Sequence, residues 1–222
     1  MKINKQINQG VNSLLLFFSG WSASPRLFEP IQAAADQDVW IVSDYRDMQW
    51  EGKLAGYERI DLLAWSMGVG VVEELFARGI FSGITFTSAT AINGTPFPVH
   101  DSYGIPEAIF RGTLDHLNEE GLRRFNRRMC GSRAVLAMYE AVPPRPLEEV
   151  REELAALYIL FGSQERSTPV FPWHKAVISS HDLIFPTSNQ EAWWQPRLPV
   201  IHIEGSHYPF HLFTHWKEIL AL

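Results

Sequence analysis

The stretch DLLAWSMGVG, from Asp61 to Gly70, decides the fold of this chain. It joins an apolar run at 60–63, typical of a buried strand, to a helix-like run at 69–78, so Ser66 falls on a tight turn between strand and helix. A turn of this kind holds a serine hydroxyl clear of the backbone, as a serine hydrolase requires of its nucleophile. The stretch therefore predicts an α/β fold in which Ser66 is a candidate nucleophile.

The turn departs in one position from the nucleophile pattern G-x-S-x-G, because Ala64 replaces the first glycine while Gly68 keeps the last. Alanine adds a single methyl group, which is a mild change where a strand and a helix pack closely. A five-residue pattern is a weak signal alone, and an ordinary serine opening a helix would also fit it. The rest of the chain has to distinguish these two interpretations of Ser66.

The composition is typical of one globular domain. The chain has 222 residues, of which 46% are hydrophobic and 20% charged. Its longest hydrophobic stretch, 14–18, is too short to cross a bilayer, and the polar start at 1–6 does not resemble a secretory signal. We therefore expect a cytoplasmic protein without membrane attachment. The formal net charge of -6 argues against general nucleic-acid binding.

Short apolar runs alternate with helix-like segments along the chain. We expect strands at 13–18, 39–42, 60–63, 84–86, 176–179 and 200–203, and helices at 30–35, 69–78, 189–194 and 213–222. Nearly continuous apolar strands separated by helices predict a mainly parallel sheet of about six strands, flanked by helices on both faces. Residues 1–222 are expected to form a single domain.

One long segment, from about 94 to 171, does not follow this alternation. It is rich in helix-like sequence and contains the proline-rich stretch 143–146, but no strand of comparable quality. In a parallel sheet, a segment inserted after the carboxyl end of a strand lies over the active crevice. We therefore expect a helical lid.

Two further segments supply the partners that a nucleophilic serine needs. Asp182 follows the expected strand 176–179, and His207 follows the expected strand 200–203. Both therefore belong to the edge of the sheet at which Ser66 emerges, in the order serine, acid, histidine that such hydrolases use. The acid orients the imidazole, which then accepts the proton of the hydroxyl. We expect Ser66, Asp182 and His207 to form a catalytic triad.

Alternatives to this triad come from other histidines and acids. His207, His211 and His215 recur every four residues and could present a metal-binding face, but Pro209 argues against a continuous helix through them and no acid or cysteine completes the set. Asp44 precedes the serine and Asp101 lies at the start of the expected lid, so Asp182 is preferred to both. We expect neither a metal nor another cofactor.

The single cysteine, Cys130, excludes an intrachain disulfide. No activating neighbour is evident in the sequence, so a small, partly buried residue is favoured over a catalytic thiol.

An oxyanion hole needs two backbone amides, one directly after the nucleophile and one from the loop after an early strand. Met67 supplies the first. The expected strand 13–18 runs into Ser19 and Gly20, which would direct the amide of Trp21 toward the oxyanion. Trp21 and Trp65 could also contact the substrate, although a plain core position is an equal alternative for Trp65.

Several segments of the chain are more specific than the serine turn: FSGW at 18–21, AWSMG at 64–68, AINGT at 91–95, DSYGIP at 101–106 and RMCG at 128–131. Together they resemble the BioG family, the pimeloyl-acyl-carrier-protein methyl ester esterases of biotin synthesis, from about Leu14 to Trp216. The resemblance implies an α/β-hydrolase fold, with Ser66, Asp182 and His207 as the triad. Ser19 stands where other esterases of this pathway often carry a histidine.

The resemblance also implies an acyl carrier protein as the partner, and such carriers are acidic. Four arginines of the expected lid could attract one: Arg123, Arg124, Arg127 and Arg128. On a helix they would be neighbours four apart and form a basic face. A solvated face with no partner is the alternative.

The expected activity is therefore hydrolysis of the methyl ester of methyl pimeloyl-acyl carrier protein. A general short-chain carboxylesterase and an acyl-carrier thioesterase would need the same triad. A catalytically silent carrier-binding module would need none. Reaction of Ser66 with a fluorophosphonate separates this last alternative from the enzymes.

Overall fold

The computed structural model describes residues 1–162 and 171–222. A seven-stranded sheet runs through the molecule in the order β1-β3-β2-β4-β5-β6-β7. The six strands from β2 to β7 are parallel to their neighbours, while β1 pairs antiparallel with β3 at one edge. The strands are β1 (Lys2–Ile7), β2 (Ser13–Phe18), β3 (Gln37–Ser43), β4 (Arg59–Trp65), β5 (Ser88–Ile92), β6 (Lys175–Ser179) and β7 (Val200–Ile203).

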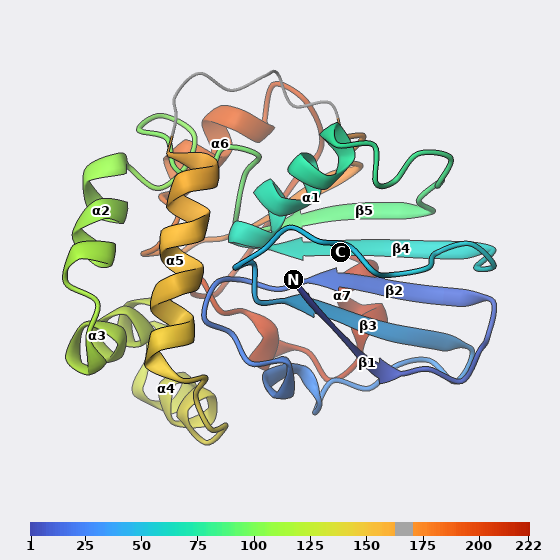
Figure 1. Ribbon diagram of the computed structural model, residues 1–222, viewed down its shortest axis with the longest axis horizontal. Coiled ribbons are helices and arrows are strands. Elements are labelled where there is room, and N and C mark those ends of the chain that lie inside the picture. The colour runs from blue at the N-terminus through green and yellow to red at the C-terminus, as the bar shows by residue number, and fades with distance from the viewer. Residues whose placement is uncertain (163–170) are drawn as a thin grey trace.

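Two groups of helices accompany the sheet. The helices α1 (Met67–Ala77), α6 (Thr187–Trp194) and α7 (Trp216–Leu220), with the 3-10 turns η1 (Pro25–Phe28) and η2 (Phe210–Leu212), follow or connect strands. Between β5 and β6 the chain forms α2 (Glu107–Asp115), α3 (Glu119–Cys130), α4 (Arg133–Glu140) and α5 (Leu147–Phe161). In Figure 1 the arrowheads of β2, β4 and β5 point toward the side on which α2 to α5 stand. Residues 163–170 of the expected lid lie outside the described part of the chain.

The burial of β2 fits its position in the interior of the sheet, between β3 and β4. All six residues of β2 are buried, and successive side chains point to opposite faces. On one face Phe17 contacts the rings of Phe28 and Trp216, with centroids 4.8 and 5.2 Å apart. On the other face Phe18 contacts Phe81 at 6.3 Å. Both faces are therefore covered, as the apolar run at 13–18 predicts.

Two predicted helices are wrong for one shared reason. The segment 30–35 and residues 213–215 are not helical, because they pair with each other: the amide of Gln32 donates to the carbonyl of Thr214 at 2.9 Å, and that of Trp216 to the carbonyl of Gln32 at 3.0 Å. Only α7 remains of the helix expected over 213–222. Pairing between residues so distant in sequence leaves no local signal.

The predicted strand at 84–86 is also wrong. The chain turns at Gly83, where φ is +77°, and the strand β5 begins four residues after the predicted start. Phe86 is buried against Phe81 and Phe171, at 5.4 Å from each, so its apolar character serves packing outside the sheet. The sequence of β5, SATAI, carries mostly small residues and therefore a weak hydropathy signal. The edge strand β1 was not predicted, because its sequence, KINKQI, is polar and lacks the apolar run by which buried strands are recognised. An edge strand tolerates such polar side chains.

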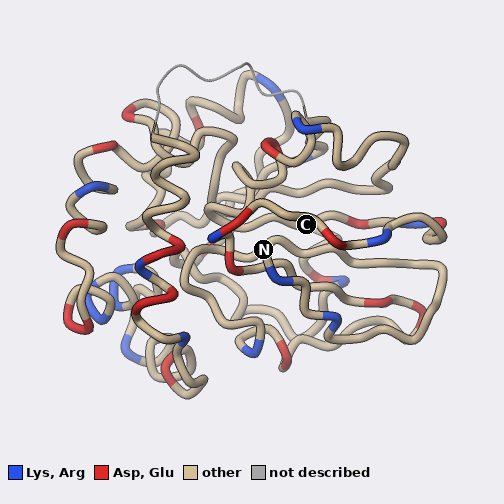
Figure 2. The backbone as a smooth tube through the Cα atoms, viewed as in Figure 1, with Lys and Arg blue, Asp and Glu red and all other residues tan. Residues whose placement is uncertain are grey.

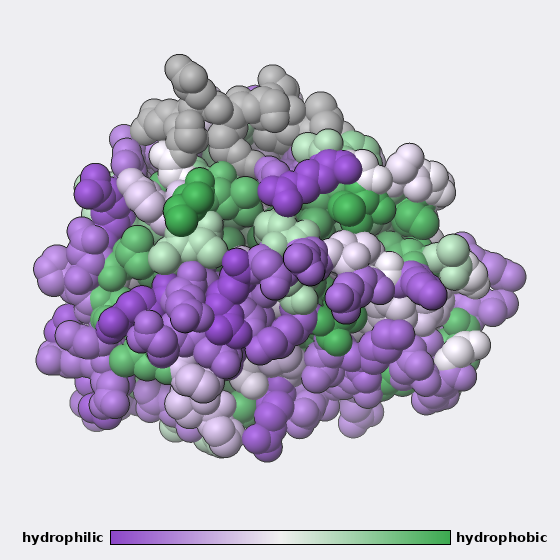
Figure 3. All heavy atoms as spheres, in the orientation of Figure 1, coloured by the Kyte–Doolittle hydropathy of each residue, from purple (hydrophilic) through white to green (hydrophobic). Residues whose placement is uncertain are grey.

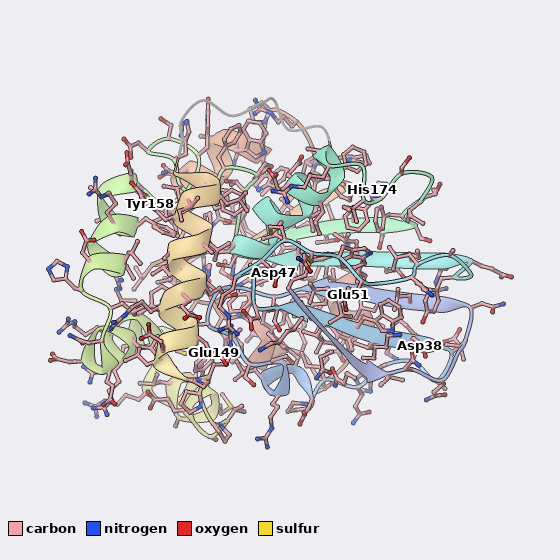
Figure 4. All side chains as sticks on the ribbon, viewed as in Figure 1. Asp38, Asp47, Glu51, Glu149, Tyr158 and His174 are labelled. Atoms are coloured by element: carbon pink, nitrogen blue, oxygen red, sulfur yellow. The ribbon has the colours of Figure 1, made fainter. Side chains whose placement is uncertain are left out.

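Side chains tie the helices of the insertion to one another and to the body. Tyr158, near the end of α5, donates from its hydroxyl to Glu107 of α2 at 2.8 Å, and Figure 4 shows Tyr158 between these two helices. The face of the molecule seen in Figure 3 is mostly hydrophilic where α5 crosses it, so α5 presents its polar side there. None of the helices among the described residues has both the length and the apolarity needed to cross a membrane.

Candidate active site

Ser66 lies on a strained turn between β4 and α1, as the sequence predicts. Its backbone has φ 59° and ψ -126°, a conformation that costs a non-glycine residue of order 1–3 kcal/mol and recurs at functional sites. Close packing holds the turn: a Cβ at Gly68 would lie 2.5 Å from the carbonyl oxygen of Phe18, and one at Gly94 would collide with the carbonyl oxygen of Ser66. The glycines at these two positions therefore allow the turn to form.

The three residues expected to act together lie in one hydrogen-bonded row. His207 Nε2 is 2.9 Å from the hydroxyl of Ser66, and His207 Nδ1 is 2.8 Å from Oδ2 of Asp182. All three residues are buried, with 5%, 1% and 6% of Ser66, His207 and Asp182 exposed. With the proton on Nδ1, the free Nε2 is able to accept the proton of the serine hydroxyl.

Besides its bond to His207, the Asp182 carboxylate accepts hydrogen bonds from three neighbouring N–H groups. Its Oδ1 accepts from the amides of Ile184 and Phe185 at 2.8 and 2.9 Å, and its Oδ2 accepts from Nε2 of Gln190 at 3.1 Å. The ring of Phe185 also stacks on the imidazole of His207, with centroids 5.9 Å apart and planes 5° apart. These contacts leave Asp182 one orientation, in which Oδ2 faces the imidazole.

Two side chains hold the backbone of His207. The indole of Trp65 donates to its carbonyl oxygen at 2.8 Å, and Nδ2 of Asn93 donates to the same oxygen at 3.0 Å. Asn93, at φ 46°, also accepts from the amide of Ser179 at 2.7 Å and so links β5 with β6. Trp65 therefore combines a core position with the wall of the active site. Asn93 and Gln190 were missed by the sequence analysis, because their roles depend on contacts across the sheet edge.

The two backbone amides expected to form an oxyanion hole, those of Trp21 and Met67, both lie next to Ser66 or to the residue before it. Met67 begins α1 directly after Ser66, and Trp21 follows β2 in a loop where a Cβ at Gly20 would lie 3.0 Å from the ring of Trp65. Within residues 1–162 and 171–222, no acceptor takes a hydrogen bond from either amide. The side chain of Trp21 contacts the insertion: its indole donates to the carbonyl of Val150 at 2.8 Å, and its ring meets that of Phe125 at 4.8 Å.

A mostly apolar pocket ends at the triad. The insertion supplies much of its wall, and the residues next to Asp182 close the other side. At the mouth, Ile109 and Leu183 are exposed at 52% and 63%. The apolar residues that line it are Trp21, Trp65, Met67, Ile105, Ile109, Phe110, Phe125, Met129, Leu154, Leu183 and Ile184.

The four arginines all lie on α3, but they do not face one groove. Arg123 and Arg127 line a groove between α3, α4 and α5, whereas Arg124, Arg127 and Arg128 line a second groove between α2 and α3. Only Arg128 also lines the pocket at the triad. Arg123 and Arg124 form ion pairs with glutamates one turn earlier, at 3.9 and 2.6 Å. Figure 2 shows these basic positions on α3, at the end of the molecule away from β1.

The alternative site residues lie elsewhere. His211 hydrogen-bonds the carbonyl of Tyr208, and His215 caps α7, so neither joins His207. Asp44 binds Arg46 at 2.8 Å, and Asp101 caps the amide of Glu107 at 2.9 Å. No group of three potential metal ligands occurs among the described residues.

Cys130, at the end of α3, is 1% exposed, and burial raises the pKa of its thiol to about 12. Because the reactive form is the thiolate, and because the thiol is buried, very little of Cys130 is in a reactive form at pH 8. Native protein treated with iodoacetamide at pH 8 is therefore expected to keep its activity and remain unlabelled, whereas the unfolded chain is labelled. Peptide mass analysis measures both. Rapid alkylation of the native protein with parallel inactivation would contradict this prediction.

Comparison with known proteins extends what the geometry shows. Residues 1–219 match the family described as pimeloyl-ACP methyl esterase BioG. An uncharacterized protein of Haemophilus influenzae is 41% identical over 206 residues, which cover 93% of either chain. A malonyl-acyl-carrier-protein O-methyltransferase of Bacteroides fragilis is 43% identical over 197 residues, covering 87% of this chain but only 39% of that protein.

Solved structures agree with the fold. The crystal structure of BioG from Haemophilus influenzae superposes with a TM-score of 0.91 at 39% identity, covering 98% of this chain and 99% of that one. A type II thioesterase, BorB of the borrelidin cluster, shares the fold at a TM-score of 0.56 and 19% identity, with 95% and 92% covered. The predicted α/β-hydrolase fold and the resemblance found in the sequence are both confirmed. The chain belongs to the BioG family of pimeloyl-acyl-carrier-protein methyl esterases.

Proposed function

We propose that this esterase hydrolyses the methyl ester of methyl pimeloyl-acyl carrier protein through an acyl-enzyme on Ser66. The observation that carries the proposal is the row from Ser66 to His207 to Asp182, with contacts of 2.9 and 2.8 Å, at the end of an apolar pocket in a BioG chain. Family membership supports the carrier-linked substrate. The geometry supports the reaction type.

In the first half of the reaction, His207 takes the proton of Ser66 while Oγ attacks the methyl ester carbonyl. The amides of Trp21 and Met67 bind the oxyanion of the tetrahedral intermediate, because both are free to donate. Asp182 stabilises the imidazolium that forms. His207 then gives its proton to the leaving methoxide, and methanol departs.

In the second half, a water molecule takes the place that methanol has left and attacks the carbonyl of the acyl-serine. His207 accepts a proton from the water as it attacks, and the collapse of the second intermediate returns the proton to Ser66. The product is a carboxylate. Since an apolar pocket disfavours an unpaired charge, the new carboxylate leaves it more readily than the neutral ester.

The carrier reaches the pocket through the groove between α2 and α3. This groove and the pocket at the triad share Ile109, Thr113 and Arg128, whereas the groove beside α4 shares no lining residue with that pocket. Where this groove joins the pocket, Arg128 meets the phosphate of the carrier's arm, and Arg124 and Arg127 flank it.

Charge reversal tests this route. Arg128→Glu is expected to raise KM for the carrier-bound ester at least about tenfold, because it places a like charge where the acidic carrier and its phosphate arrive. The kcat/KM for a small free ester, dimethyl pimelate, should fall by a clearly smaller factor, because that ester carries neither the acidic carrier nor its phosphate. Arg123→Glu is the matched control on the same helix, since Arg123 lines only the other groove, and should raise KM by about threefold or less. Equal losses on both substrates, or a larger effect of Arg123→Glu, would contradict the route.

Product analysis tests the proposed function itself. Purified protein is incubated with methyl pimeloyl-acyl carrier protein, and the carrier is examined by mass spectrometry. Conversion to pimeloyl-acyl carrier protein with release of methanol is the expected result. Release of free monomethyl pimelate with an unloaded carrier would instead show a thioesterase. An unchanged carrier-bound ester together with turnover of small free esters would indicate a general carboxylesterase.

A further inference from the structure

Helix α5 carries a buried carboxylate that the reaction scheme above does not use. Glu153 has 0% of its surface exposed. Its Oε1 accepts from the amide of Tyr45, after β3, at 2.9 Å. Its Oε2 accepts from the amide of Ser22, after β2, at 3.3 Å and from Arg145 at 2.6 Å. Burying a charged carboxylate is costly, so three donors converging on this one point to a specific arrangement rather than to packing alone.

The partners of Glu153 lie around the loop of residues 19–22, here called the oxyanion loop. The same helix binds this loop at two neighbouring points: Glu153 accepts from the amide of Ser22, and Val150 accepts from the indole of Trp21 at 2.8 Å. At the other end of the loop, the hydroxyl of Tyr45 donates to the carbonyl of Ser19 at 2.7 Å. Ser22 has a φ of 65°, so the loop takes a bend that needs outside support.

We propose that Glu153 is a positioning residue which fixes the amide of Trp21 for binding the oxyanion, so that α5 is a fixed part of the catalytic machinery. The inference rests on the proposed function, because the oxyanion role of Trp21 is assigned there. A helix that supplies two of the bonds to the oxyanion loop cannot lift away without releasing the loop. Among the described helices of the insertion, α2, α3 and α4 are therefore the ones that can open without releasing these two bonds.

A charged carboxylate suits this position because every group that meets it is a donor. Glutamine in its place would present an NH₂ group either to the amides or to Arg145, and would lose at least one bond. Figure 4 labels Glu149, one turn earlier on α5, whose carboxylate lies 3.8 Å from Arg145. Arg145 also binds Asp44 at 3.2 Å. The guanidinium therefore has two further acidic neighbours besides Glu153.

The test is Glu153→Gln, with Glu152→Gln as the matched control. Glu152 is the preceding residue of α5, is 53% exposed and binds Arg46 at 2.8 Å, so the control removes an ion pair of the same helix away from the oxyanion loop. An oxyanion donor is worth about 100- to 1000-fold in kcat, and a misplaced one loses part of this. We expect Glu153→Gln to lower kcat about 10- to 100-fold with KM within twofold, and Glu152→Gln to leave both unchanged.

A transition-state analogue separates positioning from plain stability. An aliphatic trifluoromethyl ketone adds reversibly to Ser66, whose proton passes to His207, and the resulting oxyanion occupies the oxyanion hole. Its inhibition constant should rise in Glu153→Gln by the same factor by which kcat falls. A purely structural role predicts a lower melting temperature with kcat and the inhibition constant unchanged at 25 °C, and that result would overturn the inference.

A second variant tests the support of the oxyanion loop if Glu153→Gln does not fold. Tyr45→Phe removes the hydroxyl that bonds the carbonyl of Ser19 and, at 3.1 Å, that of Val42, and it keeps the buried ring. It should lower kcat about three- to tenfold and weaken the trifluoromethyl ketone in proportion; wild-type values for both would overturn the inference. Ser66→Ala tells the two proposals apart. An inactive Ser66→Ala beside a fully active Glu153→Gln refutes only the role of Glu153, whereas an active Ser66→Ala refutes the proposed function itself.

Discussion

Ser66→Ala is expected to lower kcat for the carrier-bound methyl ester by at least about 10,000-fold. The substitution removes the oxygen that lies 2.9 Å from His207 Nε2, and no acyl-enzyme forms without it. Some catalysis above the rate in water is expected to remain from the oxyanion hole and from substrate binding. Affinity for the carrier should change by less than about twofold, because the arginines of α3 are untouched. Methanol release and a binding titration with the loaded carrier measure these two quantities.

Ser180→Ala is a suitable control for this variant. Ser180 follows β6 at the same edge of the sheet, but its hydroxyl binds the exposed Glu204 at 2.9 Å. Activity should be unchanged, and a fluorophosphonate should label this variant at Ser66 as it labels the wild-type protein. Labelling of Ser66→Ala at another serine, or activity within tenfold of wild type, would show that a different group attacks the ester.

Asp182→Asn should have the second largest effect and lower kcat by about 1,000- to 10,000-fold. The shape of the pocket should change little, because asparagine and aspartate have nearly the same size. Oδ1 of Asp182 already accepts from two backbone amides, so the new NH₂ group is driven to the side that faces His207. There it can only donate, which forces the proton of the imidazole onto Nε2. His207 would then present a proton to Ser66 and could not act as its base. Steady-state kinetics on the carrier-bound ester measure the loss.

Asp101→Asn provides the control for Asp182→Asn. Asp101 was the competing acid in the sequence, and its carboxylate accepts the amide of Glu107 at 2.9 Å, away from His207. An asparagine oxygen can still accept that bond, so activity should remain within about twofold. If Asp101→Asn lost more activity than Asp182→Asn, the assignment of the acid would be wrong.

Parts of the fold were predictable because their signal is local. The runs at 13–18, 39–42, 60–63, 176–179 and 200–203 all lie in strands. The first four are largely buried, as apolar runs in a parallel sheet predict, while 200–203 forms the partly exposed edge strand β7. The segments that were predicted wrongly depend instead on contacts with distant parts of the chain. The segments around Gln32 and His215 pair with each other across more than 180 positions, and β5 is built from small residues whose strand character depends on its neighbours in the sheet.

The candidate site shows the same division. Ser66, Asp182 and His207 could be selected because each follows a recognisable strand, and the carboxyl ends of parallel strands meet at one edge. Asn93, Gln190 and Glu153 could not be selected in this way. Asn93 and Glu153 bind backbone groups of distant loops, and Gln190 binds the carboxylate of Asp182. An amide or carboxylate in a sequence does not reveal which of these groups it will meet.

The sequence alone determined the class of fold, the family and the three residues at the end of the pocket, because strand periodicity and order along the chain are properties of neighbouring residues. Only the tertiary structure decided which groove leads to Ser66, how the arginines of α3 divide between two grooves, and which helix supports the oxyanion loop. The physical reason is that these features arise where segments far apart in sequence pack together. Their geometry depends on side-chain contacts that no local pattern specifies.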